Sequence, residues 1–189
     1  MKNFAFLIAG LFLFASACTD PEKDPLQFEK ITKGSIIALR GTAVDNLNQT
    51  SFRGSIAKFS KSGDISTQAV KFDADFLSDD LGSLSEVRVY AKATDTGVRT
   101  QLGTMPGSAF SIPAGENYPR ASFSYDASAV LSALNLDLAA LPTNSYLFIE
   151  CDLTLTNGTI VPSSAIVNSS LFESALFYPA HNLRILIVD

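Results

Sequence analysis

The chain has 189 residues, of which 19 are acidic and 14 are Lys or Arg, so its formal net charge is −5. An acidic chain without a basic run is not expected to bind nucleic acid or anionic lipid headgroups through charge. Trp is absent, Phe occurs 14 times and there are only two cysteines. The composition therefore predicts a core packed from Phe, Leu and Val, with no disulfide framework.

The first segment of the chain has the features of a secretory signal. Residues 4–17 form the apolar run FAFLIAGLFLFASA after Lys2. This run is shorter than the roughly 20 residues that a membrane-spanning helix needs, which indicates a cleaved signal peptide at residues 1–17. Small residues stand directly before Cys18, and this arrangement resembles the lipobox of bacterial lipoproteins. The resemblance implies cleavage before Cys18 and acyl chains on its sulfur that hold the mature chain on a membrane.

Residues 18–27, CTDPEKDPLQ, follow as a tether with two prolines and alternating charge. This composition predicts an extended linker between the lipid and a single domain at residues 28–189. The tripeptide Glu22-Lys23-Asp24 resembles the Lys-plus-acidic signal that sends lipoproteins of Bacteroidota to the outer face of the outer membrane. The alternative is a solvated linker with no addressing role.

Short segments in which apolar and polar residues alternate predict strands along the rest of the chain. The predicted strands are Phe28–Arg40, Ser55–Ser60, Ile65–Phe72, Ser85–Ala93, Val98–Thr104, Arg120–Tyr125, Ser145–Thr156, Thr159–Val167 and Leu183–Val188. The turn at Lys61–Asp64 predicts a hairpin between the second and third of these, and Asn157-Gly158 predicts one after the strongest strand. Pro162 restricts the strand that follows to an edge or a bulge.

One helix is predicted, at Asp126–Asn135, just before the strongest strand, Ser145–Thr156. Asp126 or Ser128 can cap its first turn, and Asn135 can end it in a left-handed conformation. Short strands at regular spacing with one inserted helix predict an all-β fold, an immunoglobulin-like antiparallel β-sandwich.

Several longer segments carry a family resemblance. They are FEKITKG, PRASFSYDASAVLSALNL, LTLTNGTIVPSS and FESALFYPAHNLRILIV. Together with the anchor they resemble Bacteroidota outer-membrane lipoproteins that have one Ig-like sandwich, and are more loosely similar to the N-terminal domain of SusE/SusF-type starch-binding lipoproteins. The resemblance implies a fold and a location at the cell surface. It implies no catalytic residue.

Catalytic chemistry is not indicated by the residues. A Ser or Cys nucleophile needs a neighbouring base, most often His. The sole histidine is His181, and no G-x-S-x-G motif accompanies it. Cys151 lies on the apolar side of its predicted strand, which favours a buried and inert thiol. The sequence therefore predicts no catalytic residues and no enzyme.

The candidate metal ligands are four aspartates between residues 73 and 80, namely Asp73, Asp75, Asp79 and Asp80. Ca²⁺ prefers several carboxylate and carbonyl oxygens on a flexible loop. The segment does not follow an EF-hand pattern, because Leu77, Ser78 and Leu84 occupy positions 5, 6 and 12. A Ca²⁺ site in a sandwich loop and a solvated acidic loop both remain as interpretations, and no other cofactor is expected.

Candidate ligand-binding residues are aromatic and polar. Tyr118, with Asn117 and Arg120, lies in a predicted loop at the end of the sandwich, where such proteins often bind ligands. Tyr90 and Phe148 lie on the polar sides of their strands and can form an outward aromatic patch. The alternatives are that Tyr118 folds over the sandwich edge, and that Tyr90 and Phe148 face a second covering of the sheet or a neighbour. Phe172, Phe177 and Tyr178 are expected to fill the core.

The sequence thus predicts a non-catalytic lipoprotein, anchored at the cell surface, that acts as a binding or accessory module, with polysaccharide capture as one role. The alternative is a structural adhesin or fimbria-like subunit that recruits a neighbour through an exposed edge strand. An enzyme is a third interpretation. It requires carboxylates such as Asp73, Asp75 or Glu116 to converge in a cleft.

Overall fold

The computed structural model describes residues 35–40, 55–78, 80–163 and 182–189, which belong to one unit, Ser35–Asp189. The predicted signal peptide, Cys18 and the tether lie outside these ranges. So do the predicted strand residues 28–34 and 164–167, and the residues Asp79, Phe172, Phe177, Tyr178 and His181. Among the described residues, no helix is long and apolar enough to cross a bilayer.

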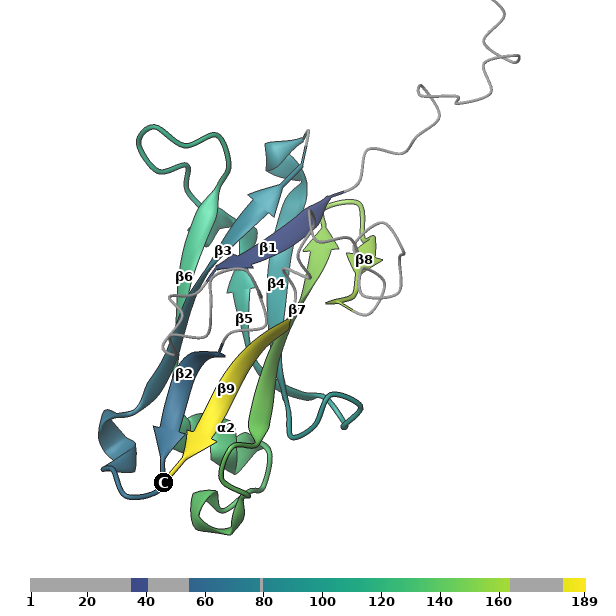
Figure 1. Cartoon of the computed structure of the whole chain (residues 1–189). Coiled ribbons are helices and arrows are strands. Elements are labelled where there is room, and N and C mark those ends of the chain that lie inside the picture. Colours follow the sequence, from purple (N-terminus) through teal and green to yellow (C-terminus); the bar gives the residue numbers. More distant parts are fainter. Residues whose placement is uncertain (1–34, 41–54, 79, 164–181) are drawn as a thin grey trace, which may run out of the picture. The chain divides into compact units, whose positions relative to one another are not determined.

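The strands form two sheets (Figure 1). The smaller sheet is antiparallel and has the order β1 (Ile36–Arg40), β3 (Ala69–Leu77) and β6 (Arg120–Asp126). The larger sheet has the order β2 (Ser55–Ser60), β9 (Asn182–Val188), β7 (Tyr146–Leu155), β4 (Leu84–Lys92) and β5 (Thr100–Pro106). The short strand β8 (Ile160–Val161) also pairs with β7.

This arrangement confirms the predicted all-β sandwich with one short helix. Sheets of the order β1-β3-β6 and β9-β7-β4-β5 correspond to the two sheets of an immunoglobulin-like sandwich. One pair departs from the expected antiparallel pattern, because β2 runs parallel to β9. The helix α2 (Ala127–Ala133) lies between β6 and β7, as predicted.

The core lies between the two sheets, and on several strands it follows from the alternation of inward and outward side chains. On β4 the buried residues are Val87, Val89 and Ala91, which are the apolar positions of the predicted pattern. Within the smaller sheet, Phe72 of β3 lies opposite Phe123 of β6, and their rings stack with centroids 5.0 Å apart. The abundant Phe of the sequence therefore supplies core volume, as its composition predicts.

The end of helix α2 shows why it stops where it does. Asn135 has a φ of 54°, and the Leu136 N–H donates to the Leu131 carbonyl at 2.9 Å, which makes a Schellman motif. The predicted left-handed stop at Asn135 is confirmed. Asp126 occupies the N-cap position, but its side chain makes no capping hydrogen bond, so that part of the expectation is wrong.

The predicted hairpin around Lys61–Asp64 is also wrong. Strand β2 pairs with β9 in the larger sheet, whereas β3 belongs to the smaller one. The first residues of the expected second strand, Ile65–Thr67, form a 3₁₀ turn, and β3 begins only at Ala69. The Gln68 side chain replaces strand pairing here: its amide accepts from the Ser60 N–H at 2.7 Å and donates to the Ser60 carbonyl at 2.9 Å. The chain can therefore cross between the sheets with its backbone satisfied.

The second predicted hairpin is confirmed. Gly158 has a φ of +84°, and β8 pairs antiparallel with the end of β7. Strand β8 stops directly before Pro162, which cannot donate to the ladder. Within the described residues, the strand expected at Thr159–Val167 is therefore limited to Ile160–Val161, which is much shorter than predicted.

We expect Gln68→Ala to lower the free energy of unfolding by about 1–2 kcal/mol, because both backbone groups of Ser60 lose a partner in a partly buried place. Urea denaturation of the purified chain measures this loss. Gln101→Ala is the matched control, since the exposed Gln101 amide bonds only the Thr104 hydroxyl. It should cost less than about 0.5 kcal/mol. Equal losses in the two variants would contradict the bridging role of Gln68.

Candidate functional site

The face of the smaller sheet that points away from the core is polar. Core residues alternate on β3 and β6 with outward ones, and the cross-strand register places Lys71 opposite Ser124, Asp73 opposite Ser122, and Asp75 opposite Arg120. Arg40, the last residue of β1, pairs with Asp73. Three strands thus bring charged and hydroxyl side chains together on one face.

Asp75 lies at the centre of this face and is only 1% exposed. Its carboxylate accepts from Arg120 Nε at 2.6 Å and from Arg120 Nη2 at 3.3 Å, and Arg40 Nε lies 2.5 Å from its other side. The hydrogen bond to Asp75 raises the pKa of Arg120 further above its usual value. Such charge-assisted pairs fix the positions of both guanidinium groups.

A groove of about 600 Å³ lies on the same face. It is lined by Arg40, Lys71, Phe72, Asp73, Ser122, Phe123 and Ser124. Within it, the Ser122 hydroxyl donates to Asp73 Oδ1 at 2.6 Å. The groove therefore offers cationic donors, hydroxyl groups and a carboxylate on a rigid sheet, a set that can hydrogen-bond a polar ligand.

The predicted ligand residues Asn117, Tyr118 and Arg120 lie where β6 begins. Asn117 and Tyr118 are exposed, and Tyr118 retains 43% of its surface. Arg120 instead is held by Asp75, and Glu116 lies 3.6 Å from its Nη2. Arg120 therefore orients this end of the face, whereas Tyr118 remains open to a ligand.

The predicted calcium ligands do not gather in one loop. Asp73 and Asp75 lie on strand β3, where a flexible loop was expected, and Asp75 is paired with two arginines. Asp80 caps the 3₁₀ turn Leu81–Ser83 by accepting from the Gly82 N–H at 3.1 Å. In the part of the chain that the structure describes, no group of three or more His, Cys, Asp or Glu is placed to hold a metal ion. Asp79 lies outside that part.

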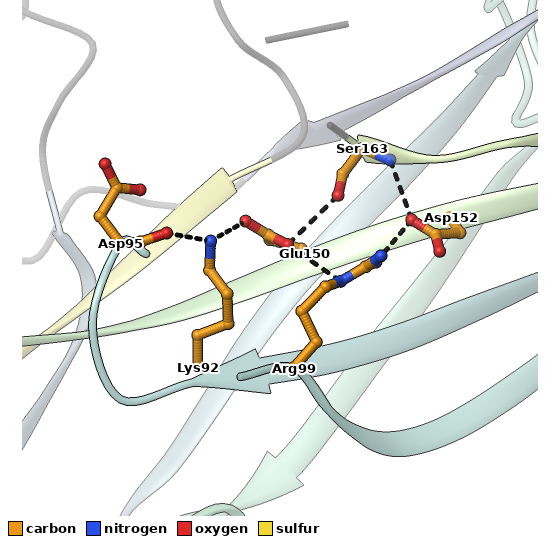
Figure 2. Close-up of polar contacts among 6 residues, drawn as sticks. All are labelled: Lys92, Asp95, Arg99, Glu150, Asp152 and Ser163. Carbon is orange, nitrogen blue, oxygen red and sulfur yellow. Dashed lines mark hydrogen bonds and ion pairs between the residues drawn. The ribbon is translucent and has the colours of Figure 1, made fainter. Parts of the chain in front are cut away.

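The opposite face of the molecule, on the larger sheet, carries a network of ion pairs (Figure 2). Glu150 of β7 lies between Lys92 Nζ at 2.5 Å and Arg99 Nε at 3.2 Å, and Arg99 Nη2 reaches Asp152 at 2.5 Å. Ser163 closes the network: its N–H donates to Asp152 at 2.9 Å and its hydroxyl to Glu150 at 3.2 Å. The side chains of Lys92 and Glu150 are only 9% and 8% exposed.

Burial lowers the pKa of Arg99, but the hydrogen bond to Asp152 and the charges of Asp152 and Glu150 outweigh this effect and raise it above its ordinary value. The arginine therefore remains a cation that neutralises two buried carboxylates. Because their charges are mutually satisfied, these groups offer little to an external ligand.

Tyr90 and Phe148 lie beside this network and do not form the expected exposed patch. Phe148 is 8% exposed, with Lys92 Nζ 5.9 Å and Arg184 Cζ 5.8 Å from its ring centroid. The Arg99 guanidinium lies 4.0 Å from the ring centroid of Tyr90. Phe148 is therefore covered, which is one of the alternatives expected for it, and cationic side chains from neighbouring strands lie over its ring.

Cys151 is buried and free, and burial raises the pKa of its thiol well above the usual range. This agrees with the predicted inert thiol. His181, the sole histidine of the sequence, lies outside the described residues.

The groove residues Arg40, Lys71, Ser122 and Ser124 were missed by the sequence reasoning. A signal was present, since KFDAD and RASFS both alternate between core and polar positions. The pairing of these two segments was not evident, because residues 76–119 lie between them and no local turn joins them. The buried partners Lys92 and Arg99 were missed for the same reason.

Comparison with known proteins gives no relative from which a role can be transferred. A scan against protein-family models found no match, and a search of curated proteins found no similar sequence.

We expect Lys92→Met and Glu150→Leu to lower the free energy of unfolding by about 3 kcal/mol or more each, because each takes the nearest charged partner away from a buried ion. The double variant should cost less than the sum of the two, since it removes both charges. Guanidinium denaturation of the four proteins in a double-mutant cycle measures the coupling. The half-exposed pair Arg88–Glu86 is the control and should contribute less than about 1 kcal/mol. Additive losses at Lys92 and Glu150 would contradict the pairing.

Proposed function

We propose that this chain is a lipid-anchored protein at the outer face of the outer membrane that captures polysaccharide and performs no catalysis. The small residues before Cys18 support lipidation, and the Pro-containing tether at residues 18–27 supports display away from the membrane. The sandwich supplies the rigid part that carries the site. Its resemblance to surface lipoproteins of Bacteroidota supports the location.

The observation that carries this proposal is the polar groove on the smaller sheet. Its volume of about 600 Å³ is that of a typical ligand pocket. Most such pockets are lined by apolar side chains, whereas five of the seven lining residues here are charged or carry a hydroxyl. A sugar chain presents many hydroxyl groups that both donate and accept, so it suits this mixture of donors and acceptors.

The position of Tyr118 extends the binding surface beyond the groove. Arg120, Ser122 and Ser124 alternate along one side of β6, and Tyr118 precedes that strand. At 3.3 Å per residue, the distance along the chain from Tyr118 to Ser124 is about 20 Å. An exposed aromatic at one end and hydroxyl groups at the other can meet successive units of an extended chain, with the ring stacking on an apolar sugar face.

The contacts on the outward face of the larger sheet make that face a poorer binding site than the groove on the smaller sheet, which supports the proposed site. There the charged groups pair with one another, and Phe148 is covered. A ligand on that face would have to break buried ion pairs before gaining contacts of its own. The smaller sheet imposes no such cost. There Tyr118 is exposed, and the Ser124 hydroxyl has no hydrogen-bond partner among the described residues.

We expect the purified protein to bind a polysaccharide saturably on a glycan array and in affinity gels. Tyr118→Ala and Ser124→Ala should each weaken binding about fivefold or more, the loss that a contributing interface residue typically gives. Ile160→Ala is the matched control, because Ile160 is an exposed apolar residue on β8 of the other sheet. Saturable binding that all three variants retain would show that the groove is not the site. The absence of binding to any glycan would overturn the proposal.

Anchoring has a separate test. In a Gram-negative host that processes lipoproteins, Cys18→Ser should abolish incorporation of labelled fatty acid and move the protein from the membrane fraction to the soluble fraction, because the acyl chains are its proposed attachment. Cys151→Ser is the control and should leave labelling intact, since Cys151 is buried in the core. Labelling that persists in Cys18→Ser would reject the anchor.

A structural subunit is the second candidate, and one observation favours it. Apart from a bridge between Ser111 and Arg120, no described strand pairs with the far edge of β6. A free edge can accept a strand from a neighbouring molecule. The glycan experiment separates the two candidates, because edge pairing needs no sugar and does not depend on Tyr118 or Ser124 side chains.

A further inference from the structure

Some charged side chains in the groove are already paired and others are not. This difference bears on which kind of polysaccharide the groove would bind. Asp75 engages Nε of Arg40 and two nitrogens of Arg120, so one carboxylate restrains both arginines. Lys71 has no ion-pair or hydrogen-bond partner within the described ranges, and it is exposed. Among the described residues, the ammonium group of Lys71 in the groove is therefore unpaired.

Arg40 adds to this positive charge. Only its Nε is engaged by Asp75, and 59% of its side chain is exposed. A guanidinium has five N–H donors, so its terminal nitrogens retain donors that can face the groove. Together, Arg40 and Lys71 place two cationic side chains at a groove in which Asp73 is the only lining carboxylate among the described residues.

The hydroxyl groups lie next to these cations. Ser124 is directly opposite Lys71 in the antiparallel register, a position in which Cβ atoms are about 5 Å apart. With the Cβ atoms this close, the Lys71 ammonium and the Ser124 hydroxyl can donate to the two oxygens of one carboxylate. One carboxylate oxygen of Asp73 accepts a hydrogen bond from the Ser122 hydroxyl, and the other can accept one from a sugar hydroxyl.

We propose that the groove selects a polysaccharide built from uronic acids, with the sugar carboxylate between Lys71, Ser124 and Arg40. This inference rests on the proposed function, because it names the kind of glycan that the same groove binds. The net charge of the chain is −5, so long-range attraction would not draw a polyanion to its surface. Selection for an acidic chain must come from the local cations.

The test compares sugar chains that share a backbone but carry either charged carboxylates or neutral esters. The full chain, purified in detergent, is titrated with polygalacturonic acid and with alginate, and with the esterified form of each, in which the carboxylates are neutral. We expect the acidic forms to bind at least about fivefold more tightly at low salt, as a charge-assisted contact at a partly exposed site contributes. The preference should shrink at 0.5 M NaCl, where screening acts over about 4 Å.

Variants locate the preference. Lys71→Gln should reduce binding of the acidic forms about fivefold and leave binding of the esters unchanged, whereas Lys71→Arg should keep the preference because it keeps the charge. Lys58→Gln is the matched control, since Lys58 is another exposed strand lysine, on β2 of the other sheet. Circular dichroism and thermal unfolding confirm that each variant is folded.

Each remaining outcome decides the matter. Equal binding of acidic and esterified chains, or binding of neutral glycans alone, would overturn the selection for uronates and leave polysaccharide capture standing. If the Lys71→Gln variant retains the preference for acidic chains, or if Lys58→Gln also loses it, then the groove is not the source of that preference. The absence of binding to any of these chains and to any neutral glycan would overturn this inference and the proposed function together.

Discussion

The structure depends on how strand β7 keeps two carboxylates away from water. One side of β7 supplies Leu147, Ile149 and Cys151 to the core, and its other side carries Glu150 and Asp152, which are also buried. Buried carboxylates require partners, or their desolvation would oppose folding. Lys92 and Arg99 provide the charges, and Ser163 provides two more hydrogen bonds from the segment after β8. This network ties β4, the start of β5 and the end of the β7–β8 hairpin into one sheet.

The two outward faces of the sandwich therefore differ in what they leave for a partner. In the network on the larger sheet, Glu150 and Asp152 are paired with Lys92 and Arg99. On the smaller sheet, Asp75 restrains two arginines, and Lys71 and Ser124 remain unengaged among the described residues. A surface whose polar groups are already paired gains little from a ligand, whereas unpaired donors in a groove gain hydrogen bonds. For the proposed binding role, this difference favours the face formed by β1, β3 and β6.

This division fits a protein that is displayed from a lipid anchor. An acyl anchor fixes only the end of a tether, so the domain can present its smaller sheet without a dedicated docking surface for the membrane. The rigidity needed for binding comes from the sheet itself, because each groove residue lies at the end of β1 or within a paired strand. Tyr118, on the loop before β6, adds an adaptable contact at one end.

By itself the sequence determined the class of fold, most strand positions, the single helix and its left-handed stop at Asn135, because these depend on local alternation and on turn chemistry. It also indicated that Cys151 is buried. Only the tertiary structure decided that β2 joins β9 and not β3, that Phe148 is covered, and that Arg40, Lys71 and Ser124 share a groove. Those features arise from strands far apart in the chain, whose register is fixed by core packing across the sandwich. No local pattern contains that information.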